Sequence, residues 1–257
     1  MFPTLFAITT NTLREAVRDR VLYNLILFVL LITGSAIFLG ELTAGQEARV
    51  IVDLGLSASL VFGTFISIFV GVSLVWKEIE KKTVYSIFSK PVGRGQFIVG
   101  KYLGLCATLL VNVAVMGLGI SLAELYVGGT QYIVPAWGAI FLIFLELTIT
   151  TAVAIVFSSF STPALSALLT FFIFLIGHFS SSLRELAQSL GSQGAIVFFN
   201  VVYYLLPNLA HFSFIANTAN GDVMPLSLLA NCLLYAAVFD GVLLAVAVLI
   251  FSRRNFK

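Results

Sequence analysis

The chain has 257 residues, of which 60% are hydrophobic and only 10% are charged. This composition is too apolar for a soluble domain of that length, and it predicts a protein embedded in a lipid bilayer. The formal net charge of +2 says little as a total, and we expect no nucleic-acid partner. The two cysteines, Cys106 and Cys232, lie in long apolar runs and are expected to be buried thiols without redox or metal chemistry.

The first 20 residues predict an amphipathic helix at the inner membrane surface. Apolar side chains fall roughly on one side of this helix and charged side chains on the other, as in interfacial helices. The apolar set is Phe2, Leu5, Phe6, Leu13 and Val17, and the charged set is Arg14, Glu15, Arg18 and Asp19.

Six later segments are long and apolar enough to be transmembrane helices, for which about 20 residues span roughly 30 Å of hydrocarbon. They are residues 21–40, 51–76, 97–126, 135–157, 163–179 and 223–251. We therefore expect an all-α polytopic membrane protein with six transmembrane helices, built as a single domain over residues 1–257.

The basic residues predict the orientation of these helices. If the N-terminus is cytoplasmic, every Lys and Arg except Arg49 and Arg184 falls on the cytoplasmic side. Basic residues in short loops are retained on that side of the membrane. Both termini are therefore expected in the cytoplasm.

Residues 180–222, before the last crossing, predict an external re-entrant segment. Residues 195–216 are apolar enough for a seventh crossing, but the uninterrupted apolar part before Pro207 is only about a dozen residues, a length typical of re-entrant pieces. A seventh crossing would also place Arg253 and Arg254 outside, against the positive-inside rule. Residues 180–194 have leucines at helical spacing among polar residues, which predicts a short helix on the outer face.

Residues 77–96 form the cytoplasmic loop between the second and third crossings. Residues 77–88 predict a short amphipathic helix, which Pro91 and the glycines after it terminate. A charged helix joined to two membrane helices can transmit the movement of a partner into the bilayer. The same residues also suit an ordinary solvated loop whose charges only fix the topology.

The chain resembles the membrane subunits of type 2 ABC transporters, nearest to the branch that contains the nitrous-oxide-reductase copper-maturation permease. The resemblance covers essentially the whole chain, including the basic N-terminal helix at residues 13–20 and the external motif at residues 204–209. After the second crossing, the positions that match the family pattern are Glu78, Glu80, Thr83, Pro91, Arg94, Gly100 and Lys101. Lys82 departs from it, because the family usually has Gly before the Thr.

The resemblance implies an ATP-driven exporter in the plasma membrane of a prokaryote. Two permease copies, or this chain and a related permease, would form the pathway, and two separate ATPase subunits would dock underneath. The coupling helix, residues 77–88, would insert into a groove of the ATPase. The ATPase-coupling residues would be Glu78, Glu80, Thr83, Ile87, Pro91 and Arg94. Membrane lipids and an extracytoplasmic protein are further candidate partners.

The chain itself is expected to be non-catalytic and to hold no cofactor. Gly95 to Lys101 fit the first seven positions of a phosphate-binding loop, but Tyr102 replaces the Ser or Thr that would hold magnesium, and the segment runs directly into a membrane helix. ATP hydrolysis is therefore expected in a partner chain.

Two carboxylates near the middle of crossings, Glu146 and Asp240, are the candidate pathway residues. Ionisable residues at membrane depth are costly and usually face a bundle interior or a cavity. They would line a polar route or an ion site, or they would only fix packing. His178 and His211 make a weak case for a metal site, because no ligand cluster accompanies them, so no metal is expected.

An ion-coupled secondary transporter that uses Glu146 and Asp240 is the alternative function. Against it, the sequence shows no inverted repeat and no paired broken helices. An intramembrane enzyme is a third class, but the usual metal-ligand and nucleophile motifs are missing from the sequence. The transported substrate does not follow from these patterns.

Overall fold

The computed structural model describes residues 2–18, 27–28, 31–32, 34–35, 38, 45–80, 93–190 and 193–253. In this part of the chain every regular element is a helix, which confirms the all-α fold class. Most of the expected first crossing, residues 21–40, lies outside the described residues. Two of its described side chains, Phe28 and Ile32, are buried in the main hydrophobic cluster.

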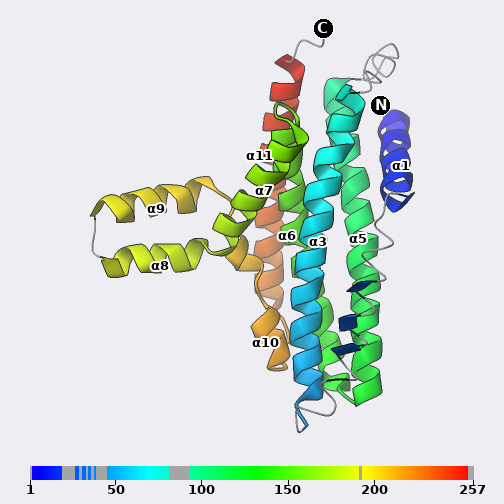
Figure 1. The fold of residues 1–257 in the computed structure, drawn as a ribbon, viewed down its shortest axis with the longest axis vertical. Coiled ribbons are helices and arrows are strands. Elements are labelled where there is room, and N and C mark those ends of the chain that lie inside the picture. The colour runs from blue at the N-terminus through cyan, green and yellow to red at the C-terminus, as the bar shows by residue number, and fades with distance from the viewer. Residues whose placement is uncertain are drawn as a thin grey trace.

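Four long helices form the body of the protein (Figure 1). They are α3 (Glu47–Glu80), α5 (Arg94–Val127), α6 (Ile133–Ser158) and α11 (Leu226–Arg253). Helices α5 and α6 each contact the other three, and the α6 span has the largest buried share, so α6 is the central helix of the bundle. A short 3-10 turn, η1 (Thr130–Tyr132), links α5 to α6.

These four helices are each long and apolar enough to cross a membrane, and the count in the described part rises to as many as six if each of two bent helix pairs is one span. The chain is therefore a multi-pass membrane protein. The four helices overlap the expected second, third, fourth and sixth crossings, with ends that differ by a few residues. The largest difference is in α3, which continues as a helix to Glu80, past the expected end at Trp76.

The N-terminus and the C-terminus lie at the same end of the bundle (Figure 1). We call this the termini end. Helix α3 ends there at Glu80, and α5 begins there at Arg94. The Arg94 guanidinium donates a hydrogen bond to the backbone carbonyl of Ser252, which joins the first turn of α5 to the last turn of α11.

Glycines allow α3 to approach its neighbours closely. A Cβ on Gly63 would lie 2.4 Å from Leu147 Cδ1 of α6, and one on Gly55 would lie 2.8 Å from Ile120 Cγ1 of α5. Real side chains do not approach so closely, so a side chain at either position would have to displace Leu147 or Ile120. Such small-residue contacts are typical of membrane helix pairs, which gain little from the hydrophobic effect.

The expected N-terminal helix is present as α1 (Phe2–Arg18). It lies alongside the termini end of α5 rather than across the end of the bundle (Figure 1). The contact is close because Gly104 of α5 has no side chain: a Cβ there would lie 2.5 Å from Thr12 Cβ and 2.8 Å from the Thr9 carbonyl oxygen. An ion pair of 3.3 Å between Glu15 and Lys101 adds a charged contact. Placement of α1 at a membrane surface stays a prediction.

The described chain between α6 and α11 contains two bent helix pairs. In the first pair, α7 (Pro163–His178) and α8 (Ser180–Leu190) meet at a bend of 62°. In the second pair, α9 (Gln193–Leu205) is bent by 60° from the segment that follows it. That segment contains η2 (Leu209–Phe212) and α10 (Ile215–Ala219). Helices α8 and α9 pack against each other and project sideways from the bundle (Figure 1). Residues 195–216 are therefore not one straight helix, whereas their external position stays a prediction.

Candidate functional site

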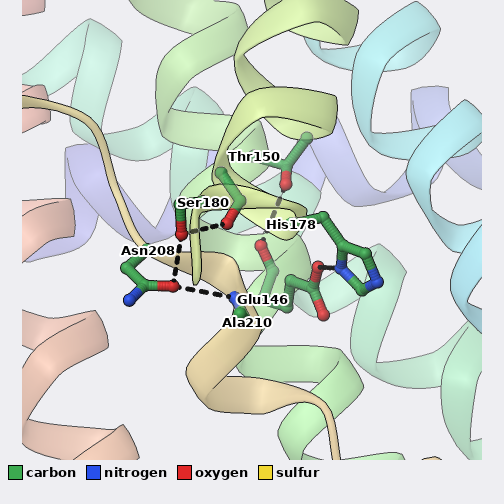
Figure 2. A network of polar contacts seen from close by, with 7 residues as sticks. Glu146, Thr150, His178, Ser180, Asn208 and Ala210 are labelled. Carbon is green, nitrogen blue, oxygen red and sulfur yellow. Dashed lines mark hydrogen bonds and ion pairs between the residues drawn. The ribbon is translucent and has the colours of Figure 1, made fainter. Parts of the chain in front are cut away.

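Glu146 lies on the central helix and is almost fully buried, with 1% of its surface exposed. Its Oε1 atom lies 3.2 Å from Nδ1 of His178, the last residue of α7 (Figure 2). Either the imidazole donates a proton to the carboxylate, or a protonated carboxyl group donates to Nδ1. The pair can therefore hold a proton inside the bundle, which is a chemistry that a plain apolar core lacks.

Aromatic rings hold His178 in this position. The Phe174 ring stacks on it with a centroid distance of 5.8 Å, and the Phe179 ring meets it edge-on at 5.6 Å. The imidazole keeps 25% of its surface exposed while its carboxylate partner is buried. His178 is therefore the accessible member of the pair.

The bend after His178 is fixed by a second polar group, centred on Asn208 (Figure 2). The Ser180 hydroxyl lies 2.8 Å from Asn208 Oδ1 and 3.0 Å from the Gly177 carbonyl oxygen. Asn208 Oδ1 also accepts a hydrogen bond from the Ala210 backbone N–H at 3.1 Å, which caps η2. The Asn208 N–H donates to the Tyr235 hydroxyl of α11 at 2.7 Å. One asparagine thus joins the end of α7, the start of η2 and α11.

Gly177 allows this arrangement because it lacks a side chain. A Cβ at this position would lie 2.5 Å from the Pro207 carbonyl oxygen and 3.0 Å from Leu209 Cγ. The returning chain therefore rests directly on the end of α7, one residue before His178.

Asp240 lies on α11 with 9% of its surface exposed. The side chains of Tyr102 on α5 and Thr148 on α6 are within interaction range of its carboxylate, whereas its Oδ1 atom is buried without a hydrogen-bond partner. Asp240 and Glu146 thus meet different neighbours, and no described contact joins the two carboxylates. They are two polar sites on opposite sides of the central helix rather than one.

A third carboxylate, Glu124, lies near the end of α5 away from the termini. It is fully buried, and neither carboxyl oxygen has a hydrogen-bond partner. A Cβ on Gly129 would lie 2.1 Å from Glu124 Oε2, so the turn after α5 closes directly over this side chain. The Glu124 side chain therefore lies within the helix packing at this end of the bundle.

The expected ATPase-coupling residues lie only partly in the described chain. Glu78 and Glu80 belong to the last turn of α3, but their side chains are outside the described part of the structure. The whole residues Thr83, Ile87 and Pro91 are also outside it. Arg94 begins α5 and is bound to α11, as described above.

The segment that resembles a phosphate-binding loop, Gly95 to Lys101, forms the first turns of α5. A phosphate-binding loop needs an irregular Gly-rich backbone with free N–H groups, which a helix does not supply. Its lysine, Lys101, is 3% exposed and paired with Glu15.

No three His, Cys, Asp or Glu side chains of the described residues are grouped so that they could hold a metal ion. His211 is separate from the Glu146 pair: its ring meets the Tyr235 ring, and its carbonyl oxygen accepts from the Cys232 thiol.

An apolar groove of about 300 Å³ lies between α3 and α7. Its lining is made of aliphatic and aromatic side chains, namely Phe65, Ile68, Phe69, Ala164, Ala167, Leu168 and Phe171. Such a surface suits hydrocarbon chains and offers almost nothing for a polar ligand to bind.

The pairing of Glu146 with His178 could not be predicted from separate helices. The expected crossings put Glu146 at mid-membrane and His178 at the outer end of the fifth crossing, residues 163–179, so they predict different depths for the two side chains. The available signal was the length of α7, which has 16 residues and ends part-way along the longer α6.

Comparison with known protein families and with curated proteins finds no match to this chain.

Proposed function

We propose that this chain is the non-catalytic membrane subunit of an ATP-driven exporter. Two copies, or this chain and a related permease, form the pathway in a prokaryotic plasma membrane, and two ATPase subunits bind on the cytoplasmic side. Glu78, Glu80, Thr83, Ile87, Pro91 and Arg94 contact or position the ATPase.

The observation that supports this proposal best is the length of α3. Its apolar span ends at Ser73, but the helix continues unbroken to Glu80, about 10 Å further at 1.5 Å per residue. A helix that leaves the membrane without a break can transmit a displacement of its cytoplasmic end to its membrane-spanning part. The basic residues of the sequence also gather near this end, which the positive-inside rule assigns to the cytoplasm.

Contacts at the termini end would transmit such a displacement from α3 and α5 to other helices. Arg94 binds the end of α11, and Lys101, two turns later, pairs with α1. A partner that moves residues 81–93 would therefore act on α3 and α5 directly, and on α11 and α1 through these two contacts.

The experiment is co-purification of the tagged chain with the ATPase encoded beside it. We expect the ATPase to stay bound to the native chain and to be lost from the E78A/E80A variant. Glu47→Ala is the matched control, because it makes the same change at the other end of the same helix. If the native chain retains no ATPase, the exporter assignment is wrong.

The buried carboxylates favour a second candidate, an ion-coupled secondary transporter. Glu146 with His178, and Asp240 with its unpartnered Oδ1 atom, could each bind a proton in a transport cycle. For this candidate we expect proton uptake by the isolated chain in vesicles without any ATPase, and its loss in the E146Q and D240N variants. Uptake that requires the ATPase would exclude it.

A further inference from the structure

Helices α8 and α9 form an arm, residues 180–190 and 193–205, that leaves the bundle at the lower end of α7 (Figure 1). The two helices are held together by packing and by the Arg184 guanidinium, which lies over the Tyr203 ring at 5.0 Å. Beyond its root, the arm has no extensive contact with the bundle in the described part of the chain. Its outward surfaces are therefore exposed in the part of the chain that the structure describes.

The two helices of the arm expose surfaces of different character. The exposed stripe of α9 is apolar and aromatic and consists of Val197, Phe198, Val201, Tyr204 and Leu205. The exposed stripe of α8 follows the same helical spacing but is mostly polar and consists of Ser182, Glu185, Leu186 and Ser189. The α9 stripe suits lipid, whereas the α8 stripe does not.

The depth of the arm along the membrane-crossing helices makes the polar character of the α8 stripe important. The root of the arm is His178, which is bonded to Glu146 near the middle of α6, 13 residues from Ile133 and 12 from Ser158. Because α6 is long and apolar enough to cross a membrane, an exposed surface beside it at that level meets either lipid or protein. A charged side chain such as Glu185 is strongly disfavoured in lipid and is expected to meet a polar partner.

The two charged residues of α8 differ in their surroundings but have opposite charges. Arg184 is half-buried over the Tyr203 ring of α9, whereas Glu185 is exposed. Neither Arg184 nor Glu185 has an ion-pair partner within the described chain, and the Arg184 Nε atom is buried without a hydrogen-bond partner. Adjacent residues on one helix do not face each other, so Arg184 cannot be paired with Glu185 of the same helix. Two copies of α8 related by a two-fold axis would bring each arginine to the glutamate of the other copy, because a two-fold interface pairs residue i with j and j with i.

We propose that the polar stripe of α8 docks on the same stripe of a second copy of this chain, with Arg184 of each copy paired to Glu185 of the other. The α9 stripe then faces lipid. This inference rests on the proposed function in one respect, namely that two copies of this chain assemble in the membrane.

Charge reversal tests the pairing directly. In the R184E variant both positions are acidic, and in the E185R variant both are basic, so neither variant should associate with itself. Mixed together, the two variants should associate, because every acidic side chain then meets a basic one. We expect differently tagged copies of the native chain to co-purify from detergent. Each single variant should lower the amount of co-purified chain at least tenfold. The R184E–E185R mixture should restore it.

Gln193 provides the matched control. It is exposed on the same arm but outside the α8 stripe, so Q193E and Q193R make equivalent charge changes without touching the proposed contact. Both controls should self-associate like the native chain. Self-association of R184E and of E185R at the native level, or no recovery in their mixture, would overturn the proposal and leave lipid as the neighbour of α8.

Cross-linking in the native membrane tests the same contact without changing any charge. In a C106S/C232S background, Leu186→Cys on the α8 stripe should form a disulfide-linked dimer under mild oxidation. Val197→Cys, on the α9 stripe and similarly exposed, should not. The absence of a cross-link at position 186 would contradict the arm contact.

Measuring ATPase retention in the same preparations separates the two proposals. A chain that pairs through its arm but binds no ATPase would contradict the exporter assignment alone. A chain that binds the ATPase while R184E and E185R self-associate normally would contradict the arm contact alone.

Discussion

His178 Nδ1 lies 3.2 Å from Glu146 Oε1, so the end of α7 is bonded to the middle of the central helix. Removing one partner leaves the other without its hydrogen bond inside the bundle. We expect E146L and H178L each to lower the free energy of unfolding by about 2 kcal/mol. The double variant should lose about 1 kcal/mol less than the sum, since such coupling inside membrane proteins is modest. Denaturant unfolding of the purified protein measures all three values, and strictly additive losses would contradict the pairing.

Gly177 should tolerate no larger residue. In G177A the new Cβ would meet the Pro207 carbonyl oxygen at 2.5 Å, and a backbone atom cannot move aside as a flexible side chain can. We expect a loss of about 1 to 3 kcal/mol in unfolding free energy. G194A is the control, because its Cβ would meet nothing within 4 Å, and the change from Gly to Ala inside a helix is favourable by about 1 kcal/mol. Equal behaviour of the two variants would show that the chain does not return over α7 as described.

Gly104 should control the attachment of α1. In G104A the Cβ would push against Thr12 and the Thr9 carbonyl group, so α1 should separate from α5. We expect limited proteolysis to cleave the N-terminal segment of G104A at least several times faster than that of the native chain. G241A, which creates no contact within 4 Å, should be cleaved at the native rate. Protection of α1 in G104A would mean that the helix is held by contacts other than this one.

The orientation in the membrane can be tested with single cysteines at the two ends of the bundle. In a C106S/C232S background, we expect an impermeant maleimide to label G128C in intact cells, because the turn after α5 lies opposite the termini. The exposed residue Ser252, replaced by Cys, should be labelled only after permeabilisation. The reverse pattern would place the termini outside and contradict the positive-inside assignment.

Glu124 should be replaceable by an apolar residue of similar length. Both of its carboxyl oxygens are buried without partners, which costs free energy that an apolar side chain would not. We expect E124M to raise the free energy of unfolding by about 1 kcal/mol. G129A should lower it, because its Cβ would collide with the Glu124 carboxylate. Destabilisation by E124M would indicate that this carboxylate has a bound partner in the native protein.

Much of the helical architecture could be predicted from the sequence, because membrane spans are encoded by local apolar runs. The runs near residues 51–76, 97–126, 135–157 and 223–251 correspond to α3, α5, α6 and α11. The short polar helix expected at residues 180–194 is present as α8. The close contacts at Gly55 and Gly63 of α3 add detail that these apolar runs do not predict.

The candidate site was less predictable, because it depends on where bends place residues from distant segments. Glu146 and Asp240 were expected to be buried near the middle of their helices, and they are. Their neighbours were not expected: the bend after α7 brings His178 to Glu146, and Asn208 reaches the same bend from 28 residues beyond Ser180. Hydrophobic periodicity predicts which face of a helix is buried. It does not predict the residue at which a neighbouring helix ends.

The hydrogen bond between Ser180 and Asn208 has a consequence for how this protein could vary. The two residues are 2.8 Å apart, although the whole arm lies between them in the chain. A segment whose ends meet can be shortened, lengthened or exchanged without moving the structure that anchors it. The residues between these two anchors could therefore differ in length or sequence among related chains while Ser180 and Asn208 keep the bend in place.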